Sequence, residues 1–285
     1  MQGSVSVTEV INKFHITKNE ILLRIRNFED TNFISSYGIK LFLPKIAGGK
    51  WLWAYVAIES MQKIVPDESI PYLEEIVENL TYPPGVCPNV SLLLYTQSTN
   101  EIYKRIYKLP GVKYAELYKV GEYNVSVPQI LPKNDWQLIT KLLVMSKLNY
   151  GKIHAFLYEP RSDADVKLSR LIWHKKNPKG ILSIFPNFNW SIIKNYTHLH
   201  LAVATKIRPK ELRRIITRLG IAANIASRFK KTYLQVEFDA WSFADIQNAI
   251  VAFQELDGLS IEGCSFAHRN RICSEWIKAY INEKI

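Results

Sequence analysis

The segment Leu52-Trp53-Ala54-Tyr55-Val56-Ala57-Ile58 has a counterpart 147 positions further along the chain, Leu199-His200-Leu201-Ala202-Val203-Ala204-Thr205. Both segments have the apolar composition of strands. The same offset aligns Leu109-Pro110-Gly111-Val112 with Leu256-Asp257-Gly258-Leu259, and each of these ends a helical pattern. Further apolar matches at this offset are Ile21 with Leu168, Ile25 with Ile172 and Ile34 with Ile181. One offset in three places predicts an internal duplication.

Each half is predicted to contain a helical segment and a wing, followed by alternating strands and helices. In the first half, Thr17 is a plausible N-cap, and Ser98-x-x-Glu101 is a capping box. The elements expected there are a helix after residue 17, a β-prone stretch at 33–43, a strand at 50–59, a helix at 70–80, a strand at 90–96, a helix from 98 to 110, and a strand at 113–127.

The second half is predicted to repeat this order. Its expected elements are helices at 135–146, 152–158 and 164–176, a wing at 180–193, a strand at 198–206, a helix at 209–219, a strand at 232–239, a helix at 243–256 and a strand at 259–267. Such alternation fits a ferredoxin-like layer. The predicted fold class is α+β, with two repeats of a winged helix-turn-helix followed by a ferredoxin-like βαββαβ domain.

Segment 7–34 contains the arginine pair Arg24 and Arg26 and ends in the apolar pair Phe33-Ile34, which leads into the wing. Together with the Leu109-Pro110-Gly111-Val112 ending, this organisation resembles the Lrp/AsnC family of transcriptional regulators, in tandem. The resemblance implies DNA-binding winged helices and ferredoxin-like (RAM-like) domains that assemble a homodimer. The implied domains are a truncated winged helix at 1–49, RAM-like domains at 50–130 and 196–285, and a winged helix at 131–195. The first winged helix is truncated because 135–146, shifted by 147, falls before residue 1.

One family feature is missing from both halves. The Gly-x-x-Asp hairpin associated with the family's effector pocket is not recognisable at 85–89 or at 229–233. We therefore name no effector and expect no cofactor.

The net charge of the chain is +11, and its pI is about 9.4. Residues 1–130 hold 13 basic and 13 acidic side chains, so the whole excess lies in residues 131–285. Segment 131–195 alone has 11 basic and 4 acidic residues. This asymmetry points to a polyanionic partner for the second half.

We expect duplex DNA to be that partner, since clustered Lys and Arg neutralise phosphates and exposed helix side chains read bases. The alternative is a solvated helix face. The predicted DNA-binding residues, all basic and on or beside the two recognition helices, are Lys18, Arg24, Arg26, Lys167, Arg170, His174, Lys175, Lys176 and Lys179.

A second basic cluster could bind phosphates or another anion, or could instead be neutralised by acidic residues of the first half such as Glu74, Glu75 and Glu78. It comprises Lys206, Arg208, Lys210, Arg213, Arg214, Arg218, Arg228, Lys230 and Lys231. Aromatic residues near the second wing could stack on unpaired bases, although such residues more often belong to a core. They are Trp173, Phe185, Phe188 and Trp190.

Catalytic and metal-binding motifs have little support. No phosphate-binding glycine loop, Gly-x-Ser-x-Gly or His-Glu-x-x-His motif occurs. Cys264, His268 and Cys273 lack paired spacing and a fourth ligand, so no metal site is predicted. The chain is predicted to be non-enzymatic.

Two alternatives to the DNA-binding regulator stay open. One is an assembly module with degenerate winged helices. The other is a tetrapyrrole enzyme, because some relatives of this build are siroheme decarboxylases; the residues that would bind tetrapyrrole carboxylates are His198, His200, His268 and Arg269.

The sequence also predicts a cytoplasmic protein. Its three cysteines cannot form a disulfide framework. The longest apolar run, 51–58, is far shorter than the roughly 20 residues that span a bilayer, so no membrane partner is expected.

Overall fold

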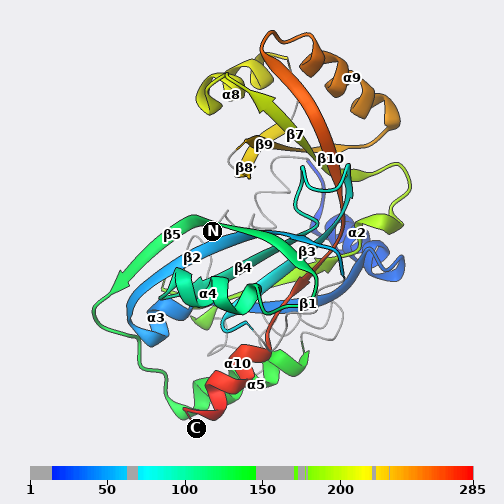
Figure 1. Ribbon diagram of the computed structural model, residues 1–285. Coiled ribbons are helices and arrows are strands. Elements are labelled where there is room, and N and C mark those ends of the chain that lie inside the picture. The colour runs from blue at the N-terminus through cyan, green and yellow to red at the C-terminus, as the bar shows by residue number, and fades with distance from the viewer. Residues whose placement is uncertain are drawn as a thin grey trace.

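The structure is a computed structural model that describes residues 15–62, 70–145, 170–172, 177, 179–219, 223–230 and 232–284 (Figure 1). Its main element is an eight-stranded sheet in the order β5-β2-β4-β3-β10-β7-β9-β8. All of the neighbouring strands are antiparallel, and the first four strands and the last four each belong to one ferredoxin-like unit. The fold class is α+β, as predicted. None of the described helices is long and apolar enough to cross a membrane.

Within residues 49–62 and 70–125, the first unit has four strands and one helix. They are β2 (Gly49–Ser60), β3 (Leu73–Tyr82), β4 (Val90–Thr96), α4 (Thr99–Ile106) and β5 (Val112–Val125). Helix α4 buries Ile102 and Ile106 against one face of the strands. The Ser98 side chain accepts a hydrogen bond from the backbone N–H of Glu101, which confirms the predicted N-cap.

The predicted helix at 70–80 is wrong, because most of it forms β3. Leu73 and Ile76 both lie in the core under α4. They are three residues apart, which is the spacing expected for one face of a helix. In β3, a bulge between Leu73 and Glu75 inserts an extra residue, so Leu73 still faces the same side as Ile76. The bulge therefore gives a strand the apolar pattern of a helix.

The second unit has the same strand order, and its described residues form two helices. Its elements are β7 (Thr197–Thr205), α8 (Pro209–Arg218), β8 (Ala223–Phe229), β9 (Tyr233–Ala240), α9 (Phe243–Gln254) and β10 (Leu259–Ile272). Helices α8 and α9 cover one face and bury Leu212, Ile216, Ala249 and Phe253. All of these elements except β8 match predicted ones.

The predicted offset recurs in the folded chain. Strands β5 and β10 are both 14 residues long and begin 147 positions apart, at Val112 and Leu259. Gly111 and Gly258, which precede them, both have left-handed backbone angles, with φ of 79° and 75°. The glycine turn and the strand that follows it therefore occupy equivalent positions in the two halves, 147 residues apart.

The two units are joined by pairing of β3 with β10. Strand β10 pairs with β7 through its first half and with β3 through its second half (Figure 1). Across this joint, Arg269 donates two hydrogen bonds of 2.9 Å to the carboxylate of Glu78. One long strand therefore belongs to both units.

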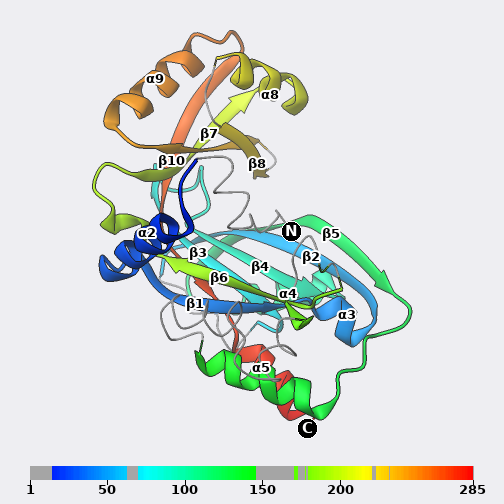
Figure 2. The ribbon, with the colours of Figure 1, turned by 180° about the vertical axis from the view of Figure 1, so that it is seen from behind.

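The wings of the two halves pair with each other. This wing ribbon consists of β1 (Ile34–Leu41) and β6 (Leu182–Phe188), which run antiparallel. It lies across the first unit (Figure 2). Helix α2 (Lys18–Asp30) precedes β1 and begins at the predicted N-cap Thr17, which forms a capping box with Glu20. Next to the ribbon lie α3 (Leu43–Ala47) and the 3-10 helix η1 (Trp190–Ile192).

Two helices complete the core beneath the ribbon. Helix α5 (Lys133–Met145) packs against the C-terminal helix α10 (Glu275–Asn282), with the Trp136 and Tyr280 rings 5.9 Å apart. The predicted helix at 152–158 lies outside the described residues, as does most of that at 164–176. The predicted domain boundaries stay predictions.

The matched glycines allow a test of local strain. Gly111→Ala should lower the free energy of unfolding more than Gly258→Ala does. Both replacements force alanine into a left-handed conformation, at about 1–2 kcal/mol. The new Cβ at position 111 would also lie 3.0 Å from the backbone nitrogen of Gln62, whereas no atom lies within 4 Å at position 258. Denaturant unfolding of both variants measures the difference; equal losses would show that the Gln62 contact costs nothing.

Candidate functional site

A cavity of about 470 Å³ lies between the wing ribbon and the first unit's sheet. We call it the wing cavity. Its lining residues come from both wings and from four strands of the first unit: Lys40, Phe42, Trp53, Glu74, Leu93, Tyr95, Val120, Ile181, Ser183 and Phe185. This volume is in the range of small-molecule sites.

Strand alternation explains why polar and aromatic residues face this cavity. Successive side chains of a strand point to opposite faces. Ala54 and Leu94 therefore pack under α4, while their neighbours Trp53 and Tyr95 turn to the face that the ribbon covers. Glu74 follows the core residue Leu73 and turns to the same covered face.

Glu74 is the buried acid of the wing cavity, with 3% of its surface exposed. Its Oε2 accepts a hydrogen bond of 3.0 Å from Nε1 of Trp53. Burial raises the pKa of the carboxyl to about 7, against the opposing effects of the nearby Lys40 charge and the Trp53 hydrogen bond. A carboxyl with this pKa can give or take a proton near neutral pH.

Lys40 provides the positive charge of the cavity. Its Nζ lies 2.5 Å from Glu75 Oε2 and 4.7 Å from the centroid of the Phe185 ring. Phe42, which also lines the cavity, packs against two other aromatic residues, with its ring 6.2 Å from that of Tyr95 and 4.8 Å from that of Tyr123. Burial raises the pKa of Tyr95 far above its usual range, so its hydroxyl stays protonated. Flat apolar walls with one cation and one acid suit an aromatic carboxylate ligand.

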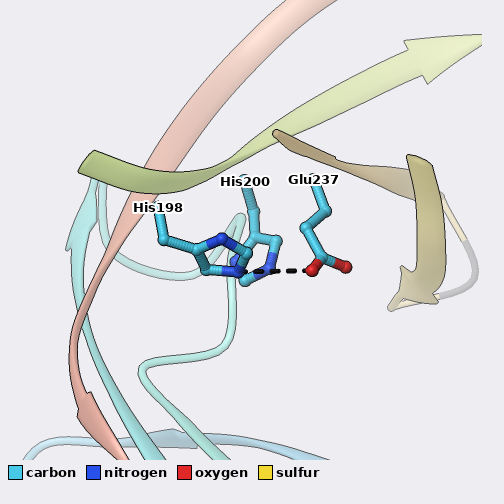
Figure 3. Close-up of side chains that lie close together, drawn as sticks. All are labelled: His198, His200 and Glu237. Carbon is cyan, nitrogen blue, oxygen red and sulfur yellow. Dashed lines mark ion pairs between the residues drawn. The ribbon is translucent and has the colours of Figure 1, made fainter. Parts of the chain in front are cut away.

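A second polar cluster lies in the second unit, and we call it the histidine cluster. It contains His198 and His200 from β7 with Glu237 and Asp239 from β9. Figure 3 shows the first three of these side chains. Within each strand the two residues are two positions apart, so their side chains point to the same face of the sheet. All four side chains therefore share one face. In the antiparallel register, His198 pairs with Asp239, and His200 pairs with Glu237.

His198 is held between the two carboxylates. Its Nδ1 lies 2.9 Å from Asp239 Oδ1, and its Nε2 lies 3.3 Å from Glu237 Oε1. Burial lowers the pKa of His198, but the hydrogen bonds to Asp239 and Glu237 outweigh burial and raise it to about 9. The hydrogen bond from His198 lowers the pKa of each carboxylate. In His200, burial first and then the His198 charge lower the pKa to about 4.

Other residues surround the histidine cluster. The Trp190 ring stacks on His198 at 5.7 Å between centroids. The hydroxyl of Tyr196 donates a hydrogen bond of 2.7 Å to Asp239, and Ser265 Oγ lies 3.4 Å from His200 Nδ1. The cluster is therefore packed against an indole ring and contacts the hydroxyl groups of two neighbouring side chains.

The predicted DNA-binding residues that the structure describes do not line the wing cavity and are not in the histidine cluster. Lys18, Arg24 and Arg26 are exposed on α2, and Arg170 and Lys179 are also exposed. The remaining four lie outside the described residues: Lys167, His174, Lys175 and Lys176.

The residues considered for tetrapyrrole carboxylates are only partly brought together. The His198 and His200 rings lie 5.1 Å apart. Arg269, by contrast, pairs with Glu78, and the buried Nδ1 of His268 has no hydrogen-bond partner among the described residues. The considered metal ligands Cys264 and Cys273 pack on two different cores.

Glu74, Glu75 and Glu78 do not pair with the described members of the second basic cluster, but another acid of the first half does, since Lys230 Nζ lies 2.7 Å from Glu59 Oε2. Glu74 bonds Trp53, Glu75 pairs with Lys40, and Glu78 pairs with Arg269. On α8 the exposed side chains form a shallow groove, lined by Lys210, Arg213, Arg214, Thr217 and Arg218.

The sequence matches no protein-family model and no curated protein. Among solved structures the chain is similar to two crystal structures of the siroheme decarboxylase NirDL, one of them in co-complex with an iron-uroporphyrin III analogue. In both, the identity is 12%, the TM-score is 0.44, and the match covers 96% of this chain and 90% of that chain. It is also similar to the crystal structure of PH0061, with 18% identity, a TM-score of 0.25, and coverage of 43% of this chain and 84% of that chain. The enzyme structures contradict our prediction that the chain is not an enzyme, and we do not retain it.

The sequence points to His198 and His200 as candidate binding residues, but not to Glu237, Asp239 or the wing cavity. Glu74 falls within the predicted helix at 70–80, which gives no indication of its burial in a cavity. For the histidine cluster a signal did exist, because His198-x-His200 and Glu237-x-Asp239 each place two polar side chains on one face of a predicted strand. Their meeting depends on the β7–β9 register, which the sequence does not contain.

Proposed function

We propose that the chain is an enzyme that binds a tetrapyrrole carboxylate in the wing cavity and removes carboxyl groups from it as CO₂. The observation that carries this proposal is the buried Glu74 opening into an aromatic cavity beside Lys40. A tetrapyrrole is flat, aromatic and bordered by carboxylates, so it matches the walls and the charge of this cavity. The NirDL structures are consistent with this choice but do not carry it.

The residues have distinct roles in the proposed reaction. Phe42 and Phe185 contact the ring faces, and Lys40 holds a substrate carboxylate. The bond between the reacting carboxylate and its carbon breaks, CO₂ leaves, and the electron pair stays on that carbon. The acid form of Glu74 then gives its proton to the carbon, and solvent restores the acid. The negative charge of the reacting carboxylate thereby passes to Glu74, and exclusion of water by the aromatic walls favours departure of neutral CO₂ from the poorly solvated carboxylate.

The positions of the described residues support DNA binding less directly than they support ligand binding in the wing cavity. Binding of duplex DNA by α2 stays a prediction. The exposed Lys18, Arg24 and Arg26 agree with it. However, β1 and β6 pair with each other and line the wing cavity, so the wings have a structural role inside the chain. Homodimer formation also stays a prediction.

The binding step can be tested with iron uroporphyrin as the probe. Ser183→Trp should place an indole in the wing cavity and weaken binding at least about tenfold, because the ligand and the indole compete for the same space. Asn100→Trp, which adds the same ring on the exposed surface of α4, should leave binding unchanged. Titration followed by absorption spectroscopy measures both. No binding to the unmodified chain, or equal binding to both variants, would overturn the proposal.

A further inference from the structure

The histidine cluster offers a group of side chains that the proposed reaction does not use. One ligand atom each from His198, His200 and Glu237 lies within 4.8 Å of the others (Figure 3). We infer that these three residues hold a divalent transition metal of the zinc class. Two imidazoles and one carboxylate form a set that zinc uses in sites with three protein ligands and an open position.

The distances fit such a site. Zinc binds nitrogen and oxygen at about 2.0–2.2 Å, so two ligands of one tetrahedral ion lie roughly 3.4 Å apart. His198 Nε2 and Glu237 Oε1 already lie 3.3 Å apart. No two of the three ligand atoms are more than 4.8 Å apart. Side-chain rotations that move these atoms by about 1 Å would therefore bring all three within bonding distance of one ion.

The neighbours of the histidines are arranged as partners of metal ligands usually are. A ligating histidine donates its second ring N–H to a carboxylate or another acceptor, which fixes the ring. Oδ1 of Asp239 accepts a hydrogen bond of 2.9 Å from Nδ1 of His198. The other ring nitrogen, Nε2, therefore points toward Glu237. Ser265 lies 3.4 Å from Nδ1 of His200, which leaves the other nitrogen of that ring for the ion. Asp239 is therefore a positioning residue for the site.

Burial and backbone also suit a metal. The His198 side chain is 19% exposed and that of Glu237 is 35% exposed, so an ion can enter from solvent. Both histidines come from β7, and Glu237 comes from the adjacent β9, which fixes the three Cα positions through the ladder. The softer imidazoles disfavour magnesium and calcium, which take oxygen ligands.

Zinc titration of the full chain tests this inference. After removal of metals with a chelator, the chain should bind one equivalent of zinc by calorimetry. Glu237→Gln should weaken binding at least about 100-fold, because it removes a charged ligand, and Asp239→Asn about 10–100-fold. Glu262→Gln, an exposed change of the same charge on β10, should leave the affinity unchanged.

A second readout does not depend on any variant. Cobalt(II) added to the unmodified chain should give the visible absorption of a four-coordinate ion without a thiolate band. A thiolate band, no visible absorption, no zinc uptake, or equal uptake by Glu237→Gln and the unmodified chain would each overturn the inference. The probe is a metal alone, so failure here leaves tetrapyrrole binding in the wing cavity unaffected.

Discussion

Glu74→Gln should lower the rate of tetrapyrrole decarboxylation by about 10²–10⁴-fold, the usual contribution of general acid catalysis. Glutamine has the same shape and can still accept the Trp53 hydrogen bond, but it has no proton to give to the carbon that CO₂ leaves. Binding should therefore change little. Single-turnover experiments, with product identified by mass spectrometry, separate the rate from the affinity.

The matched control is Glu101→Gln, which makes the same change on the exposed face of α4. Its rate should equal that of the unmodified chain. A Glu74→Gln chain that binds iron uroporphyrin normally and decarboxylates at an undiminished rate would remove Glu74 from the reaction. In the active chain, the rate should fall as pH rises through about 7, the raised pKa of Glu74, because the acid form is lost.

The same carboxyl should make the fold less stable as the pH rises. The pKa of Glu74 is about 7 in the folded chain, against 4.5 as its ordinary value. Between these values the folded chain holds a proton that the unfolded chain has lost, so the free energy of unfolding falls with rising pH. This difference in pKa corresponds to a loss of roughly 3 kcal/mol in the free energy of unfolding. The loss begins near pH 4.5 and is complete slightly above pH 7.

Comparison with Glu74→Gln isolates this effect from other titrating groups. The variant has no carboxyl at this position, so relative to the unmodified chain it should gain roughly 3 kcal/mol between pH 4 and pH 8. Denaturant unfolding at several pH values measures the gain, and Glu101→Gln again serves as control. A constant difference between the Glu74→Gln chain and the unmodified chain at all pH values would show that Glu74 ionises equally in both states.

The local elements could largely be predicted from the sequence, because apolar periodicity and capping residues act over short distances. Thr17 and Ser98 begin helices where predicted, and the 147-residue offset holds from β5 to β10. The exception at β3 has a physical reason: its bulge reproduces a helical spacing in a strand. A bulge is decided by the partner strand, which a local pattern does not specify.

The candidate sites could not be predicted, because each depends on contacts between distant segments. Lys40 meets Ser183 only because β1 and β6 pair, in the register that places the two residues opposite each other. Glu74 becomes a buried acid only when this ribbon covers its strand. In the sequence, Glu74 is one of many carboxylates, and nothing near it in the chain indicates its burial.

The pairing of β1 with β6 also has a consequence for synthesis of the chain on the ribosome. Ile39 and Leu41 are completely buried in the finished ribbon, but their partners in β6 are about 140 residues away. At roughly 5–20 residues per second, translation needs about 7–30 s to produce them. During that interval the nascent chain carries an unpaired apolar strand, so we expect its folding yield to rise when ribosome-associated chaperones are present.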